Sequence, residues 1–156
     1  QFGRDDTDVV AAKYPDIPFV HMSGDHVLTG KERHAWVRTN GVGYPCRAIR
    51  TYDFLYIRNY QPDRWPAGNP ETGYLNTDGG PTKSIILNMN RRNLAHDLWE
   101  INFGKRVEEE LYNIVSDPEC TINLVFQNEH DVLKQKLKSQ LVKELTELLE
   151  NIKGKK

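Results

Sequence analysis

Cationic side chains gather between residues 33 and 64, on and beside two apolar runs that alternate in a strand-like way. Arginine presents a planar fork of N–H donors that matches sulfate, carboxylate or phosphate oxygens through paired hydrogen bonds. The cluster therefore predicts a surface for an oxyanion, with solvated strand faces and local ion pairs as the alternative interpretation. Its members are Arg33, His34, Arg47, Arg50, Arg58 and Arg64.

The positions of these cations limit how many of them can share one pocket. Side chains alternate between the two faces along a strand, so Arg47 and Arg50 are expected to point to opposite sides. For Arg50 and Arg58 we favour pairing with acidic residues, among them the glutamates at 108–110. The six side chains are therefore not expected to line one pocket together.

Short motifs of nucleophilic and metal-dependent catalysis are missing from the sequence. It contains no G-x-S-x-G elbow, no G-x-x-x-x-G-K-S/T loop and no H-E-x-x-H pair. Cys46 and Cys120 lie far apart without metal-ligand spacing, so each is interpreted as a small buried hydrophobe. The formal net charge of −1 argues against nucleic-acid binding, which draws on a large positive field.

Most of the cations belong to the stretch 44–68. Within it, 46–51 and 54–59 are predicted to form a hairpin across residues 52–53. The second run is apolar on both faces, which favours a strand that is central and covered on both sides. Residues 61–81 then form a loop too long for an ordinary connection. Its prolines, glycines and Trp65 predict an ordered, functional loop.

Helical spacing is clearest near the C terminus, where apolar residues recur every three or four positions from Leu133 to Ile152. This spacing predicts an amphipathic helix packed on a sheet. A second helix is predicted to begin at Thr82, with that residue as its cap, a break near 88–93 and Gly104 at its end.

Short β-prone runs are predicted at 19–22, 26–29 and 109–115, in addition to the hairpin. Together with the helices they predict one α+β domain. We expect a small antiparallel sheet of about four strands, a long C-terminal amphipathic helix and a second helix.

A resemblance to a known enzyme family is found in four runs of the sequence, which follow the order GKERH, GYPCRAIRTYDFLYIRNYQPDRWPAG, DGGPTKS and LWEINFGKRVEEELYNIVSDPECTINLV. Over about residues 26–145 these runs resemble the C-terminal part of bacterial sulfatases similar to heparan N-sulfatase (N-sulphoglucosamine sulphohydrolase). The combination is specific, whereas E-L-Y with D-P alone would indicate only a sulfatase. One departure is Val107, where the family would have proline.

What the resemblance implies is a two-part enzyme that hydrolyses sulfate esters or N-sulfates of glycosaminoglycan-type sugars. The family's large N-terminal domain holds a divalent metal, usually calcium, and a formylglycine made from Cys or Ser in a C/S-x-P-S/A-x-R motif. The smaller C-terminal part closes one side of the pocket. Cys46 does not match the motif, because Arg47-Ala48-Ile49-Arg50 follows it. The isolated chain is therefore expected to contain no catalytic or metal-binding residue and to be inactive.

Substrate-binding candidates follow from the resemblance residue by residue. The E-R-H and Y-P-x-R runs supply pocket-rim residues, and the long loop supplies a wall for a sugar ring and its anionic group. Structural hydrogen bonding is an equally good interpretation for His34 and Arg47, and a core or interface position is favoured for Trp65. The candidates are Glu32, Arg33, His34, Arg47, Arg64 and Trp65.

Residues 1–25 are expected to be a lead-in from a missing catalytic domain, and residues 26–156 the sulfatase C-terminal subdomain. The start QFGRDDTDVV has no signal-peptide pattern, and no run reaches the ~18 apolar residues of a membrane span. Because the chain opens at Gln1 with no initiator Met and no targeting segment, it is interpreted as a processed product or a cloned fragment of something longer. For a bacterial parent the resemblance implies a periplasmic or extracellular location.

The expected partners are an N-terminal catalytic domain of the same polypeptide and a sulfated saccharide. Self-association of the fragment is expected through the face that such a domain would cover. Neither nucleic acid nor a membrane span is expected. Two alternatives remain, namely a non-catalytic module that binds anionic carbohydrate and a piece that only supports the missing domain.

Overall fold

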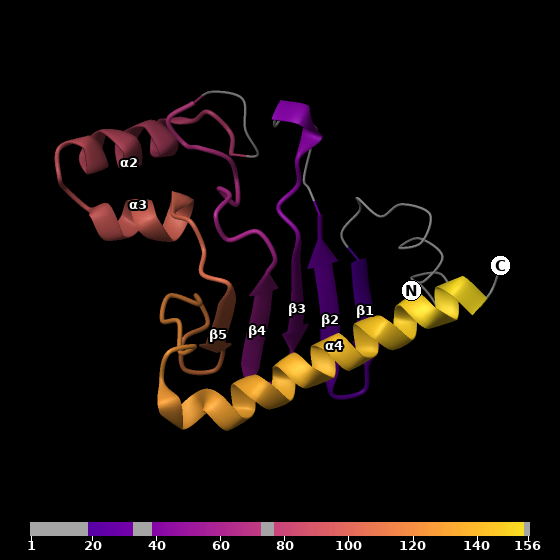
Figure 1. Cartoon of the computed structure of the whole chain (residues 1–156). Helices are drawn as coiled ribbons and strands as arrows, with labels where there is room; N and C mark the ends of the chain where they lie inside the picture. Colours follow the sequence, from indigo (N-terminus) through magenta and orange to yellow (C-terminus); the bar gives the residue numbers. More distant parts are fainter. Residues whose placement is uncertain (1–18, 33–38, 73–76, 155–156) are drawn as a thin grey trace.

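The computed structural model describes residues 19–32, 39–72 and 77–154. Five strands form one antiparallel sheet, and their order in space is their order in the sequence (Figure 1). The predicted α+β class and antiparallel sheet are confirmed, with five strands where about four were expected. The strands are β1 (Phe19–Ser23), β2 (His26–Lys31), β3 (Cys46–Arg50), β4 (Phe54–Asn59) and β5 (Glu109–Asn113).

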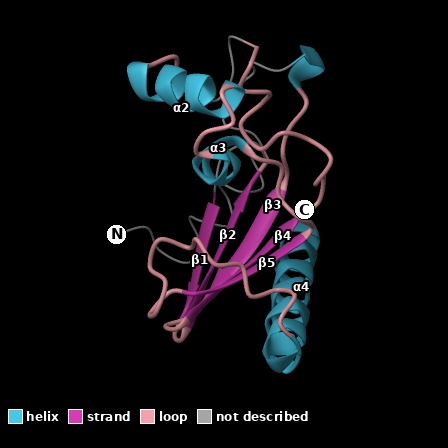
Figure 2. Cartoon of the chain, turned by 90° about the vertical axis from the view of Figure 1, so that its left-hand side faces the viewer, coloured by secondary structure: helices cyan, strands magenta, loops and turns pink. Residues whose placement is uncertain are grey.

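Three α-helices accompany the sheet within the described ranges. The long helix α4 (Asp131–Gly154) crosses one face of the sheet and packs against β3 and β4 (Figures 1 and 2). The helices α2 (Pro81–Arg91) and α3 (His96–Phe103) lie beyond the end of the sheet. Both belong to the segment 60–108, which is inserted between the neighbouring strands β4 and β5. Single turns of 3-10 helix lie at Thr39–Gly41 and Asn128–His130.

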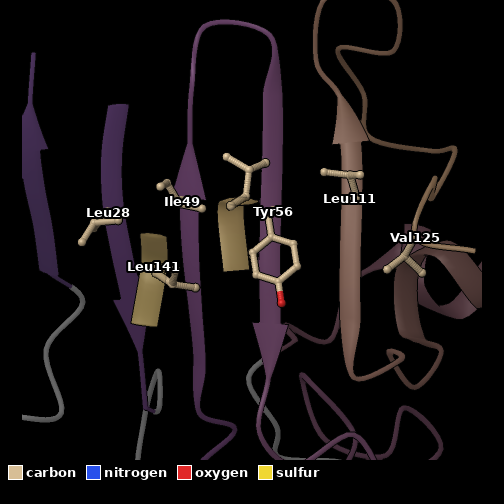
Figure 3. Packing of buried hydrophobic residues seen from close by; sticks show 7 residues of the cluster. Leu28, Ile49, Tyr56, Leu111, Val125 and Leu141 are labelled. Carbon is tan, nitrogen blue, oxygen red and sulfur yellow. The ribbon is translucent and has the colours of Figure 1, made fainter. Parts of the chain in front are cut away.

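A row of apolar side chains across four strands forms the centre of the core (Figure 3). Residues of this row face one another in the antiparallel register, and each is completely buried. Leu137 and Leu141 of α4 join the same buried cluster, as the spacing of leucines predicts. The row consists of Leu28, Ile49, Tyr56 and Leu111.

The predicted hairpin is confirmed, and both of its strands are inner strands of the sheet, as predicted. β3 is the middle strand, and β4 lies between β3 and β5. Although α4 covers one face of β4, no helix among the described residues packs on the other face. Coverage of β4 by helices on both faces is therefore not found in the described part of the chain.

β1 lies within residues 1–25, which were expected to be a lead-in. It pairs with β2 over its whole length, from Phe19 opposite Gly30 to Ser23 opposite His26. Among the residues that the structure describes, the sheet therefore begins at Phe19, and β1 and β2 form a tight hairpin.

Helix α2 begins at Pro81 rather than at Thr82. Proline suits the first helical position, since its φ is already helical and its missing N–H is not needed there. Gly80 occupies the cap position, and no side chain caps the helix by a hydrogen bond. The prediction that Thr82 caps the helix is therefore wrong.

The helical segment breaks between Arg92 and Ala95, slightly later than predicted. Asn93 and Ala95 adopt positive φ values of 58° and 49°, which reverse the chain between α2 and α3. Gly104 follows α3, as predicted. Its φ of −57° is open to any residue, but a Cβ there would lie 2.5 Å from the carbonyl oxygen of Glu100. Glycine is therefore required for space, not for its backbone angle.

Candidate functional site

One end of the sheet brings together segments that are distant in the sequence. Because neighbouring strands are antiparallel, the end of β2, the start of β3 and the end of β4 meet there. Glu32 follows β2, Arg47 lies in β3, and Arg64 with Trp65 lies in the loop after β4. The candidates Arg33 and His34 lie outside the described residues.

Arg47 is held by the end of β2. Its Nη1 donates to the carbonyl oxygen of Cys46 at 2.8 Å and to that of Lys31 at 3.4 Å. Its Nη2 forms an ion pair with the carboxylate of Glu32. Both side chains of this pair remain partly exposed, at 23% and 30%. The guanidinium is thus fixed in direction and largely neutralised, yet still in contact with solvent.

Hydrogen bonds to backbone carbonyl oxygens join the same segments. The N–H of Tyr44 donates to the carbonyl oxygen of Glu32 at 2.7 Å. On the other side, Arg64 Nη1 donates to the carbonyl oxygen of Gly43 at 2.9 Å. The run that precedes β3 therefore links Glu32 to the long loop, and three of the candidates belong to one hydrogen-bonded unit.

Trp65 lies among aromatic and cationic side chains of α3 and the residues after it. Its ring meets the ring of Trp99 edge to face, with centroids 5.9 Å apart. His96 stacks on Trp99 at 5.8 Å, and Lys105 Nζ lies 5.4 Å from the centroid of the Trp65 ring. Trp65 thus joins the long loop to α3. The sequence offered no signal for Lys105, because nothing in its neighbourhood connects it with a tryptophan so far away.

Arg58 lies directly opposite Arg47 in the register of β3 and β4, so the two share one face of the sheet, but Arg58 has ion-pair partners of its own. Arg47 and Arg50 point to opposite faces of the sheet, as predicted, and Arg50 is exposed. Arg58 forms ion pairs with Glu108 and with Glu109, the second at 3.1 Å. The predicted pairing of Arg58 with these glutamates is confirmed, and the cations that the structure describes do not all lie on one face, because Arg50 points to the other side.

Glu109 connects the sheet to α4. Its Oε1 accepts from the Tyr56 hydroxyl at 2.9 Å, from Arg58 Nη1 at 3.1 Å and from Lys138 Nζ at 2.5 Å. Burial alone would raise the pKa of Glu109, but the hydrogen bonds from Lys138 and Tyr56 and the charges of Lys138 and Arg58 lower it. Lys138 was missed, since a lysine on an amphipathic helix carries no sign of its partner.

A buried polar cluster lies on the sheet face opposite α4. Glu110 accepts from Asn59 Nδ2 at 2.6 Å and from the Tyr112 hydroxyl at 2.5 Å. Asn59 Nδ2 also donates to the carbonyl oxygen of Val107 at 2.8 Å. Burial and the hydrogen bond to Glu110 raise the pKa of Tyr112. Both carboxylate oxygens are satisfied by neutral donors, so the cluster stabilises the sheet and does not offer a reactive acid.

Both cysteines are free thiols. Burial raises the pKa of Cys46 and of Cys120, so neither is a reactive thiolate at neutral pH. In the described part of the chain, no three His, Cys, Asp or Glu side chains are grouped to hold a metal ion. None of the helices described is long and apolar enough to cross a membrane.

Comparison with known proteins does not assign the chain to a family. No protein-family model matches the chain, and no curated protein matches it. The resemblance to sulfatases therefore stays a prediction from the ordered runs of sequence.

Proposed function

We propose that this chain is the C-terminal part of a sulfatase that acts on sulfate esters or N-sulfates of glycosaminoglycan-type sugars. In this proposal an N-terminal domain of the same polypeptide supplies the formylglycine, the calcium ion and the chemistry at sulfur. The chain itself binds and orients the sugar and supports the catalytic domain, in a periplasmic or extracellular parent enzyme.

One observation supports the proposal: three of the sequence runs that resemble sulfatases lie together at one end of the sheet. The E-R-H run contributes Glu32, the Y-P-x-R run contributes Arg47, and the P-D-R-W run contributes Arg64. Glu32 pairs directly with Arg47, and Arg64 is connected to them through the backbone of Gly43 and Tyr44. Residues that bind one ligand together must lie close in space even when they are distant in the sequence, whereas charges that only solvate the surface need not.

Arg47 is the residue best placed to meet an anionic substituent of a sugar. Its side chain is partly exposed, and the carboxylate of Glu32 together with two carbonyl oxygens fixes its direction. A guanidinium that is already oriented loses less side-chain entropy when it binds an oxyanion. Glu32 would serve to position Arg47, and Arg64 would hold the run before β3 in place.

In the full-length parent enzyme, replacing Arg47 by alanine is expected to lower kcat/KM for a sulfated disaccharide about tenfold to a hundredfold. This range corresponds to the loss of one hydrogen-bonded contact to a charged group. Steady-state kinetics with one O-sulfated and one N-sulfated disaccharide would measure it and would show which bond is cleaved. The matched control is Arg91→Ala, which removes an exposed arginine paired with Glu71 on the inserted segment.

Three outcomes separate the alternatives. A parent protein that hydrolyses neither substrate, or a gene with no C/S-x-P-S/A-x-R run upstream, removes the sulfatase proposal. Unchanged kinetics together with a lower melting temperature for Arg47→Ala would mean that the chain only supports the catalytic domain. Loss of kcat/KM in Arg47→Ala but not in Arg91→Ala supports substrate positioning.

The alternative function, a module that binds anionic carbohydrate without catalysis, gains some support from the cluster of Trp65, Trp99 and Lys105. An aromatic ring beside a cation suits a sugar that carries an anionic group. Isothermal titration of the isolated chain with a sulfated oligosaccharide tests this function. Affinity that weakens with added salt is expected for such a module, whereas no binding at millimolar ligand would remove it.

A further inference from the structure

His26 is a buried histidine held between two carboxylates. The residue is only 6% exposed and begins β2 at the turn of the β1–β2 hairpin. Its Nδ1 lies 2.7 Å from Asp25 Oδ1, and its Nε2 lies 2.8 Å from Glu144 Oε2. Asp25 belongs to the turn itself, whereas Glu144 comes from the second half of α4. One imidazole therefore links two elements that are far apart in the sequence.

Geometry alone favours the protonated imidazole at this position. A neutral imidazole has one N–H donor and one bare nitrogen, whereas an imidazolium has two donors. Both ring nitrogens of His26 face carboxylate oxygens, which are acceptors when ionised. Loss of the proton would leave one nitrogen lone pair directed at a carboxylate. Both contacts are satisfied together only when His26 carries a positive charge.

The second half of α4 depends on this contact more than the first half does. The first half packs Leu137 and Leu141 into the centre of the core. Beyond Leu141, the apolar contacts of α4 that the structure describes come from Leu145 and Leu148, which are only partly buried. The link from His26 to Glu144 is a polar contact in this region, and Gln140 Nε2 supports it by donating to Glu144 Oε1 at 3.0 Å.

We propose that His26 is a pH-dependent latch that holds the second half of α4 against the β1–β2 hairpin when protonated and releases it when deprotonated. The charged groups that face the imidazole are Asp25 from the turn and Glu144 from α4. The positive charge of Lys136 on α4 attracts the Asp25 carboxylate. Gln140 Nε2 lies 3.3 Å from His26 Nδ1 and 3.4 Å from His26 Nε2. Both carboxylates favour the imidazolium, and the neutral amide of Gln140 does not oppose it.

The direction of the pH effect follows from the pKa of His26. Burial alone would lower this pKa, but hydrogen bonds to Glu144 and Asp25, and then their charges, raise it above the ordinary value of 6.5. A raised pKa in the folded state means that the contact stabilises fully below the ordinary value. The stabilisation is lost as the pH rises from 6.5 through the raised pKa. The latch is therefore closed in weak acid and opens toward alkaline pH.

Hydrogen–deuterium exchange of the full chain tests the latch. Exchange rates, corrected for the intrinsic effect of pH, would be measured about one unit below and two units above the ordinary histidine pKa. Protection of the amides at 143–151 is expected to fall at the higher pH, by up to about tenfold for each unit by which the pKa is raised. Amides within 134–141 are expected to change much less.

His26→Gln is the informative variant, because glutamine keeps a donor and an acceptor but does not titrate. In this variant, the exchange protection of the amides at 143–151 is expected to be independent of pH. It should equal the protection of the same amides in the wild type at high pH. The matched control is His96→Gln, which removes an exposed histidine on α3 and should retain the wild-type response. His130, in the 3-10 turn just before α4, is unchanged in both variants, so their difference isolates His26.

Two results would overturn the proposal. One is equal protection of 143–151 in the wild type at the two pH values. The other is the same pH dependence in His26→Gln as in the wild type. Should His26→Gln fail to fold, Glu144→Gln replaces it, and an NMR titration of the His26 ring then decides. Titration of the wild-type ring below the ordinary pKa, or no downward change in Glu144→Gln, would contradict the latch.

Discussion

Replacing Leu141 by alanine is expected to lower the free energy of unfolding by about 3 kcal/mol. Leu141 is 1% exposed and belongs to the cluster formed by α4 and the row of apolar residues on the sheet. The shorter side chain removes apolar contact and leaves a cavity that the rigid sheet cannot close. Urea unfolding followed by circular dichroism would measure the difference.

The control for Leu141 is its neighbour Val142, which lies on the outer side of α4 and is 54% exposed. Val142→Ala is expected to change the free energy of unfolding by no more than about 0.5 kcal/mol. Similar effects of the two substitutions would mean that α4 does not cover the sheet with this face.

Glu109→Ala is expected to cost about 2–3 kcal/mol of stability. The substitution leaves the hydroxyl of the completely buried Tyr56 without its carboxylate, and it leaves Arg58 and Lys138 without a shared partner. Removing one member of a largely buried polar network costs more than the network itself contributes. Glu109 is suited to this test because its side chain is only 17% exposed.

The dependence on pH gives this prediction a second measurement. Since the pKa of Glu109 is lowered in the folded protein, its contribution is present above the ordinary value of 4.5 and is lost as the pH falls through the lowered pKa. The difference between wild type and Glu109→Ala should therefore shrink in acid. Glu108→Ala is the control, because Glu108 is 59% exposed and its substitution should cost less than about 1 kcal/mol. An equal cost for both would contradict the role of Glu109.

Local patterns in the sequence were sufficient for the hairpin of β3 and β4 and for α4. A short connection between two β-prone runs leaves few other pairings, and leucines spaced by three and four positions can share a face only on a helix. The start of α2 was misplaced because Thr82 is a good cap in general, whereas here Pro81 already occupies the first helical position.

Contacts between distant polar residues could not be predicted in the same way. Arg47 meets Glu32 because the register of β2 and β3 places Gly30 opposite Arg47, which brings the residues after β2 to this arginine. Lys138 meets Glu109 because α4 crosses the sheet in one particular direction. Charge and spacing alone are equally compatible with other partners, so these choices depend on the assembled sheet.

The insertion of residues 60–108 between β4 and β5 has a consequence for how this protein can change during evolution. The two strands keep their register through pairs such as Tyr56 opposite Leu111, whatever lies between them. The free energy of closing a flexible loop grows only with the logarithm of its length, by about 0.6 kcal/mol for each doubling. Lengthening or shortening the part of this segment that does not contact the strands would therefore cost the sheet little. New recognition surfaces could arise at this end of the molecule while the framework that supports them is inherited unchanged.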